Sequence, residues 1–127
     1  MEKSDIRILI VDDDSESRYI FPYVLSKMGY SQVDSIDGRG AKERIDDYTP
    51  NLILIDPKIH PLVKPSDICS YANKSATILF MSTDTESQFK TTYSQYGAKG
   101  FFDKSLFLKE GKKDLDNIIL NTMDLAL

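Results

Sequence analysis

Short apolar runs alternate along the chain with segments in which apolar residues recur at helical spacing. Four runs are dominated by branched aliphatic or aromatic side chains: Ile6–Val11, Leu52–Ile55, Thr77–Met81 and Gly100–Phe102. Because the first three lack the alternation of a half-exposed strand, they predict strands buried on both faces, as in a parallel sheet. A weaker run at Gln32–Ile36 predicts a strand at the edge of that sheet.

Helical patterns fill the gaps between these runs. The first predicted helix runs from Asp14 to Gly29, and the next two span Arg39–Tyr48 and Ser66–Ala72. A fourth begins with a capping box at 85–88 and ends at Gly97. The last has a core face of Leu115, Ile118, Ile119 and Met123. In the first helix, the spacing predicts that the core face consists of Ile20, Tyr23, Val24 and Met28. Pro22 lacks an N–H, so we expect it to kink this helix or to end its first part.

Strand and helix alternate five times, and this order predicts the fold class. We expect one α/β domain over residues 1–127, with a doubly wound five-stranded parallel sheet and helices on both faces. The flavodoxin-like strand order 2-1-3-4-5 makes the first and third strands neighbours.

Composition and charge argue against some classes of function. The 127 residues carry a formal net charge of −4, which argues against a basic face for binding DNA or RNA. No apolar run in the sequence approaches the length of a membrane span. The single cysteine, Cys69, cannot form an internal disulfide, which suits a reducing cytoplasm. We therefore expect a cytoplasmic protein with no direct contact to nucleic acid or membrane.

Reactive side chains follow the central strands at their carboxyl ends. The first strand runs into Asp12 and Asp13, the third into Asp56, the fourth into Ser82 and the fifth into Lys104. In open α/β sheets, ligands bind beyond this edge, where the strand order reverses. These four strands are consecutive in the order 2-1-3-4-5, so their side chains can converge on one small volume.

The charge of this cluster predicts a metal ion. Three carboxylates and one lysine leave two negative charges, and like charges this close raise one another's pKa unless a cation joins them. Mg²⁺ suits the site better than Zn²⁺, because no histidine or cysteine lies in the strand-end motifs. An aspartate nucleophile, Mg²⁺ and a lysine are the parts that phosphoryl transfer requires.

These motifs resemble the receiver domains of response regulators, in particular the chemotaxis regulators of two-component signalling. ILIVDDD at 8–14 resembles the acidic pair that holds Mg²⁺, PNLILID at 50–56 the phosphoacceptor strand, ILFMST at 78–83 the switch strand, and GAKGFFDK at 97–104 the last strand. By position, Asp12 and Asp13 are the acidic pair, and Asp14 is the cap of the first helix.

The resemblance implies a mechanism. Asp56 is the phosphoacceptor, Mg²⁺ is held by Asp12, Asp13, Asp56 and the backbone carbonyl of Lys58, and the phosphoryl contacts come from Ser82, Thr83 and Lys104. A sensor histidine kinase or phosphotransfer protein supplies the phosphoryl group. Ser82 and Phe101 then switch the face formed by the fourth helix, fifth strand and fifth helix, which a downstream effector binds. The chain is not otherwise an enzyme: it catalyses only its own phosphorylation and dephosphorylation.

The sequence departs from the family at two places near the site. Lys104 is followed by Ser105 instead of the usual proline, so we expect a trans peptide bond in a shifted loop. The loop after Asp56 is also unusual and carries Lys58 two residues on, while Asp84 lies two residues after Ser82. We hypothesise that Lys58 and Asp84 pair across the mouth of the site and limit the access of water to the phosphoryl group.

Two alternatives of other classes stay open at this point. One is a protein-interaction module with the receiver fold that works without phosphorylation, which the altered loop and Ser105 favour slightly. The other is a phosphatase of the haloacid-dehalogenase type, but its Asp-x-Asp-x-Thr or Val signature is incomplete after the first strand. A homodimer formed on phosphorylation is also left open.

Overall fold

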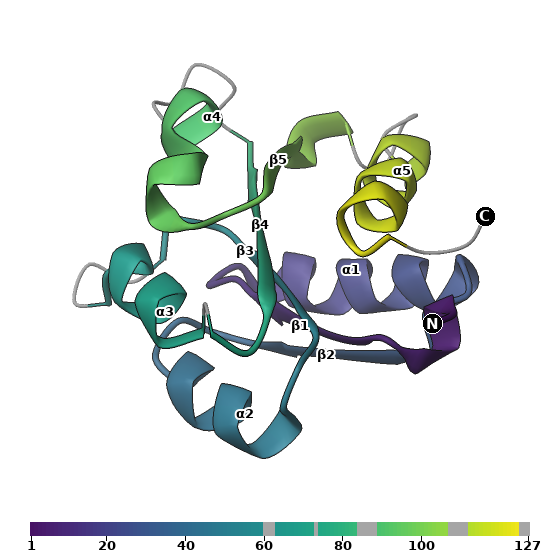
Figure 1. Cartoon of the computed structure of the whole chain (residues 1–127), viewed down its shortest axis with the longest axis horizontal. Helices are drawn as coiled ribbons and strands as arrows, with labels where there is room; N and C mark the ends of the chain where they lie inside the picture. Colours follow the sequence, from purple (N-terminus) through teal and green to yellow (C-terminus); the bar gives the residue numbers. More distant parts are fainter. Residues whose placement is uncertain (60–62, 73, 84–88, 107–111, 125–127) are drawn as a thin grey trace.

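Five parallel strands form a single sheet in the order β2-β1-β3-β4-β5 (Figure 1). The computed structural model describes residues 1–59, 63–72, 74–83, 89–106 and 112–124. The strands are β1 (Arg7–Val11), β2 (Gln32–Ile36), β3 (Leu52–Ile55), β4 (Thr77–Ser82) and β5 (Gly100–Asp103). The predicted fold class and strand order are confirmed, with each strand within about one residue of the apolar run that predicted it.

Helices cover both faces of this sheet. They are α1 (Ser15–Lys27), α2 (Ala41–Tyr48), α3 (Pro65–Ala72), α4 (Phe89–Thr92) and α5 (Lys112–Thr122), with short 3₁₀ turns η1 (Lys3–Asp5), η2 (Tyr93–Tyr96) and η3 (Lys104–Leu106). In Figure 1, α1 and α5 lie on one side of the sheet, and α2 and α3 lie on the other. Among the described helices, none combines the length and apolar character needed to cross a bilayer.

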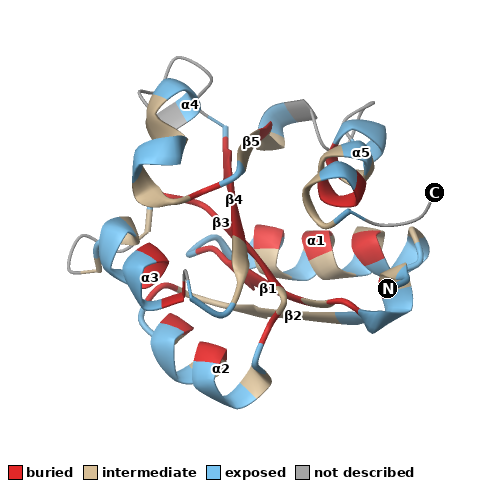
Figure 2. Ribbon diagram, viewed as in Figure 1, coloured by how far each residue is buried: buried red, intermediate tan, exposed pale blue. Residues whose placement is uncertain are grey.

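The sheet is buried on both faces, which produces two apolar layers. Alternate strand residues point to opposite sides, so Ile8 and Ile10 pack on the α1–α5 side, whereas Leu9 and Val11 pack on the α2–α3 side. All four side chains are fully buried, and Figure 2 shows the same burial along the central strands. This explains why the central strands appear in the sequence as continuous apolar runs.

The predicted core face of α1 is confirmed in part: Ile20, Val24 and Met28 pack half-buried against the core, but the fully buried residues are others. Ser17, Phe21 and Leu25 are its buried residues, spaced four apart on a single stripe. Tyr23, which was predicted to face the core, is 56% exposed. Residues two apart on a helix point about 200° away from each other, so with Phe21 on the buried stripe Tyr23 faces solvent.

Pro22 lies inside α1 without ending it, so of the two expected effects of this proline, a kink or an end of the helix, the second does not occur. In a helix, the N–H of residue 22 would bond to the carbonyl of Arg18, four residues earlier. The Ser35 hydroxyl, from β2, donates to that carbonyl at 2.9 Å instead. A neighbouring strand therefore supplies the hydrogen bond that the proline removes.

Replacing Ser35 by alanine is expected to destabilise the domain by about 1–2 kcal/mol, because the Arg18 carbonyl loses its donor in a partly buried place. Urea unfolding at equilibrium measures this difference. Ser35→Thr keeps the hydroxyl on a residue suited to strands and serves as the control, with stability close to wild type. Equal stability of the alanine variant and wild type would show that Pro22 is tolerated for another reason.

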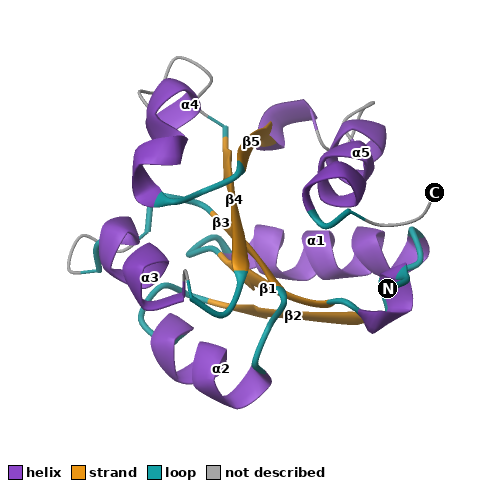
Figure 3. Cartoon of the chain, viewed as in Figure 1, coloured by secondary structure: helices purple, strands orange, loops and turns teal. Residues whose placement is uncertain are grey.

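The fourth predicted helix is confirmed in its last part. α4 covers four residues and continues as η2, and Gly97 ends the segment with a left-handed φ of 85° (Figure 3). The capping box predicted at 85–88 lies outside the described residues. α5 is confirmed, with Leu115 and Ile119 buried and Ile118 and Met123 half-buried against the same layer.

Candidate functional site

The backbone fixes two acidic side chains at the carboxyl edge of the sheet. β1 lies between β2 and β3, and both ladders continue one residue past the strands: the N–H of Asp12 donates to the Ile36 carbonyl of β2 at 3.0 Å, and the N–H of Asp56 to the Val11 carbonyl at 2.9 Å. Asp12 and Asp56 are only 2% and 8% exposed. Two carboxylates are thus held in a buried position by hydrogen bonds of the sheet itself.

Lys104 joins these two carboxylates. Its Nζ lies 2.6 Å from Oδ2 of Asp12 and 3.0 Å from Oδ2 of Asp56, and all three side chains are largely buried. The three residues follow β5, β1 and β3, so strands far apart in the sequence contribute to one contact. This convergence is the one that the strand-end pattern predicts.

The surroundings of these groups shift their pKa values. Burial raises the pKa of Asp56, while the N–H of Lys58, which donates to its Oδ1 at 2.9 Å, and the Lys104 ammonium act in the opposite direction. Burial alone would lower the pKa of Lys104, but Asp12 and Asp56 outweigh it, so that pKa is raised. At neutral pH the lysine is therefore charged, and it balances one of the two acids.

Asp13 and Asp14 have different roles in the structure. Asp14 caps α1: its carboxylate accepts the N–H of Glu16 and the hydroxyl of Ser17, each at 3.1 Å, as predicted. The bond from Glu16 is the main reason that the pKa of Asp14 is lowered. Asp13 is exposed, and its Oδ1 accepts the N–H of Gly38 at 2.8 Å.

The carboxylates of Asp12 and Asp56 suit a hard divalent cation, but the third predicted ligand, Asp13, is not grouped with them. Asp12 and Asp56 already present oxygens to a shared cationic group, and carboxylate oxygens are the ligands that Mg²⁺ prefers. Within the described residues, however, no three acidic, histidine or cysteine side chains form a metal-binding group. Asp13 would have to move toward Asp12 and Asp56 before it could join them.

The remaining predicted site residues lie around this centre. Ser82, at the end of β4, is fully buried, whereas the neighbouring Thr83 is exposed and lines a pocket of about 140 Å³ with Lys104 and the start of α1. Phe101 is half-buried against the apolar layer on the α2–α3 side. Lys58 is exposed, and Asp84 lies outside the described residues.

Two residues that sequence reasoning missed support the acidic pair. The Arg18 guanidinium donates to the Asp12 carbonyl at 2.9 Å, and Arg18 lies one helical turn past the cap Asp14. Gly38 follows Asp37 in an Asp-Gly pair after β2, and a Cβ there would lie 3.0 Å from that of Ile59. The Asp-Gly pair is a sequence signal for a tight turn, but the partner of its N–H is visible only in the fold.

The predicted trans bond after Lys104 is confirmed, because the described part of the chain contains no cis peptide bond. The turn that follows has its own support. Oδ1 of Asp103 accepts the N–H of Ser105 at 2.9 Å and its hydroxyl at 2.7 Å.

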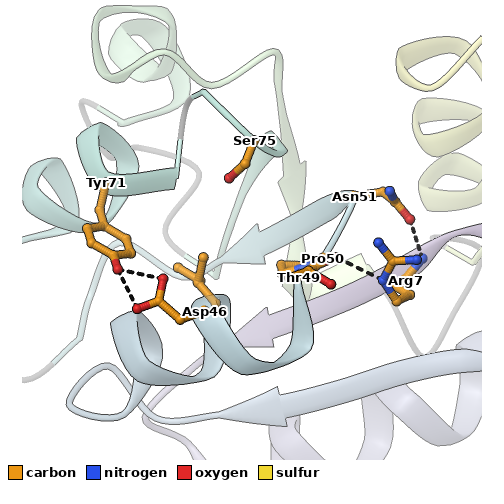
Figure 4. Close-up of a pocket in the computed structure, with 8 residues that line it drawn as sticks. Arg7, Asp46, Thr49, Pro50, Asn51, Tyr71 and Ser75 are labelled. Carbon is orange, nitrogen blue, oxygen red and sulfur yellow. Dashed lines mark hydrogen bonds between the residues drawn. The ribbon is translucent and has the colours of Figure 1, made fainter.

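A second pocket, of about 460 Å³, opens at the opposite edge of the sheet (Figure 4). On one wall, the Tyr71 hydroxyl donates to both oxygens of Asp46, and on another, Nε of Arg7 donates to the carbonyl of Thr49 at 2.8 Å. The polar side chains of this pocket are hydrogen-bonded within its walls, and its described lining contains no lysine in contact with carboxylates. The arrangement suited to phosphoryl transfer therefore lies at the carboxyl edge.

Comparison with known families gives one match that spans most of the chain. A family model described as the response regulator receiver domain matches residues 8–116. This range includes all the strand-end residues described above.

Solved structures share the fold at low sequence identity. The signal receiver domain of the putative response regulator NarL from Mycobacterium tuberculosis has 21% identity and a TM-score of 0.74, over 91% of this chain and 94% of that one. The receiver domain of sensor histidine kinase PA1611 from Pseudomonas aeruginosa PAO1, with a magnesium ion coordinated in its active site cleft, has 17% identity and a TM-score of 0.76, over 94% and 98%. A chain in the complex of the CheA3 P1 domain with CheY6 from R. sphaeroides has 20% identity and a TM-score of 0.81, over 95% and 98%.

Proposed function

Since this chain belongs to the response regulator receiver family, we propose that it is a phosphorylation switch whose phosphoacceptor is Asp56. The observation that carries the proposal is the contact of one lysine, Lys104, with two buried carboxylates from neighbouring strands. A carboxylate that is buried and partly balanced is suited to act as a nucleophile toward phosphorus.

In the transfer step, an oxygen of Asp56 attacks the phosphorus of phosphohistidine. The new P–O bond forms as the P–N bond breaks, and the imidazole leaves with the electron pair and takes up a proton. The Lys104 ammonium contacts the phosphoryl oxygens and stabilises their negative charge, and the hydroxyls of Ser82 and Thr83 donate hydrogen bonds to the same oxygens. Mg²⁺ bound by Asp12, Asp13, Asp56 and the Lys58 carbonyl would neutralise the charge that gathers on the phosphoryl group.

Phosphorylation would then change the surface that partners bind. A phosphoryl group adds charge and hydrogen-bond acceptors next to Ser82, and Phe101 is only half-buried, so it has room to change its degree of burial. The proposed output face is formed by α4, β5 and α5, and a homodimer on phosphorylation is a further outcome to test. Lys58 and Asp84 stay the predicted pair that limits hydrolysis.

The proposed donor is a sensor histidine kinase or a phosphotransfer protein, and the chain acts in the cytoplasm as a switch rather than as a multiple-turnover enzyme. The CheY6 structure, which contains a P1 domain of CheA3, supports a partner of this class. Incubation with acetyl phosphate and Mg²⁺, followed by intact mass measurement, tests the function. One phosphoryl adduct is expected; no adduct would favour a protein-interaction module, and turnover of a generic phosphate ester would favour a phosphatase.

Mg²⁺ is expected to shift the backbone amide signal of Gly38 in the NMR spectrum of the unphosphorylated protein. The reason is that Oδ1 of Asp13 accepts the Gly38 N–H, so a movement of Asp13 toward Asp12 and Asp56 changes the surroundings of this amide. Asp13→Asn keeps an acceptor for Gly38 but loses the charge, so the same shift should require higher Mg²⁺ concentrations. A Gly38 signal that stays in place while signals around Asp12 and Asp56 move would exclude Asp13 as a ligand.

A further inference from the structure

The turn after β5 contains a residue to which nothing above assigns a functional role. Asp103 is the last residue of β5 and pairs in register with Ser82, and Lys104 begins η3 directly after it. We propose that Asp103 is a positioning residue whose carboxylate closes this turn and thereby aims Lys104 at Asp12 and Asp56. The inference deepens the proposed function and rests on it.

The hydrogen bonds of Asp103 go to the residue beyond the lysine. Its Oδ1 accepts both the N–H of Ser105 at 2.9 Å and the Ser105 hydroxyl at 2.7 Å. An aspartate that accepts the N–H two residues on fixes the backbone between them, as an Asx turn does. The residue between them here is Lys104, whose Cα position is set by this closure.

The residue at position 105 is the reason that the turn depends on hydrogen bonds to Asp103. Receivers usually carry proline after this lysine, and a proline restrains the chain through its ring but has no N–H to donate. Ser105 lacks the ring and supplies two donors, and both bond to Asp103. The Asp103–Ser105 pair therefore provides a restraint in place of the one that a proline ring would supply.

The position of Lys104 matters because its ammonium has two partners at once. Nζ lies 2.6 Å from Asp12 and 3.0 Å from Asp56, which a flexible four-carbon side chain maintains only when its backbone is fixed. During transfer, the ammonium also has to reach the phosphoryl oxygens. A displacement of the turn would weaken that contact without removing any group that touches the phosphoryl donor.

The test compares phosphorylation by acetyl phosphate in wild type, Asp103→Ala and Asp103→Asn. At saturating donor, Asp103→Ala is expected to slow phosphorylation about tenfold, because a displaced charge stabilises the transition state less. The half-saturating donor concentration should change little. Asp103→Asn keeps the side-chain oxygen as an acceptor and should restore most of the rate. Asp47→Ala, which removes an exposed acid of α2, controls for the change in net charge.

Three results would overturn the inference: an Asp103→Ala variant as fast as wild type, an Asp103→Asn variant as slow as the alanine variant, or an effect confined to the half-saturating concentration. If Asp103→Ala does not fold, Ser105→Ala decides. That variant loses one of the two donors and should slow phosphorylation about two- to threefold, and a wild-type rate would overturn the inference. Absence of an adduct on wild type would instead count against the proposed function.

Discussion

Replacing Lys104 by methionine is expected to destabilise the domain by about 3–5 kcal/mol at pH 7, because two buried carboxylates lose the cation they share. Methionine has a similar length and no charge, so the change isolates the electrostatic contribution from packing. Phosphorylation of this variant should also fall sharply, since no ammonium remains to contact the phosphoryl oxygens.

The destabilisation should depend on pH in a defined direction. Loss of the lysine raises further a pKa of Asp56 that burial already places above its ordinary value of 3.8. An acid whose pKa is higher in the folded state than in the unfolded state makes folding less favourable as pH rises between the two values. The deficit of Lys104→Met should therefore shrink when the pH is lowered from 7 to 4.

Chemical denaturation at both pH values measures this effect. Lys99→Met, at an exposed lysine just before β5, is the matched control and should be close to wild type at both. An equal deficit at pH 7 and pH 4 would mean that lost packing, and not the unbalanced carboxylates, destabilises Lys104→Met.

The second large effect is the loss of the phosphoryl adduct in Asp56→Asn. The amide has nearly the shape of the carboxyl group, and its oxygen can still accept the N–H of Lys58, but it is not a nucleophile toward phosphorus. The fold should be retained within about 1 kcal/mol at pH 7, since the substitution removes a buried negative charge. Intact mass measurement after incubation with acetyl phosphate and Mg²⁺ gives the result.

Asp12→Asn is the matched control for this experiment. It also removes one buried carboxylate next to Lys104, but it leaves the proposed nucleophile in place. We expect slower adduct formation in this variant, and none in Asp56→Asn. An adduct of wild-type yield on Asp56→Asn would assign the nucleophile to another residue. The same holds if the adduct is lost completely in Asp12→Asn but is retained in Asp56→Asn.

Features with a local cause were predictable from the sequence. The apolar runs gave the central strands because residues buried on both faces leave a continuous pattern, and strand order then placed Asp12, Asp56 and Lys104 together. Asp14 was predictable as a cap because its two bonds lie within the next three residues.

Features that depend on distant partners were not predictable. The bond from Ser35 to the Arg18 carbonyl explains an uninterrupted α1, but it joins two elements that the sequence does not relate. The same holds for Asp13, which has the position of a metal ligand and bonds to Gly38 in the fold. Tyr23 shows that helical spacing alone does not decide which of two adjacent stripes is buried.

The position of the acyl phosphate tests the central claim most directly. Borohydride reduces an aspartyl phosphate to homoserine, so protein treated with acetyl phosphate and Mg²⁺ can be reduced, digested and sequenced by mass spectrometry. We predict homoserine at position 56 and at no other aspartate. Homoserine at Asp12 or Asp13, or an adduct that leaves every aspartate unreduced, would contradict the assignment of the carboxyl edge as a phosphoacceptor site centred on Asp56.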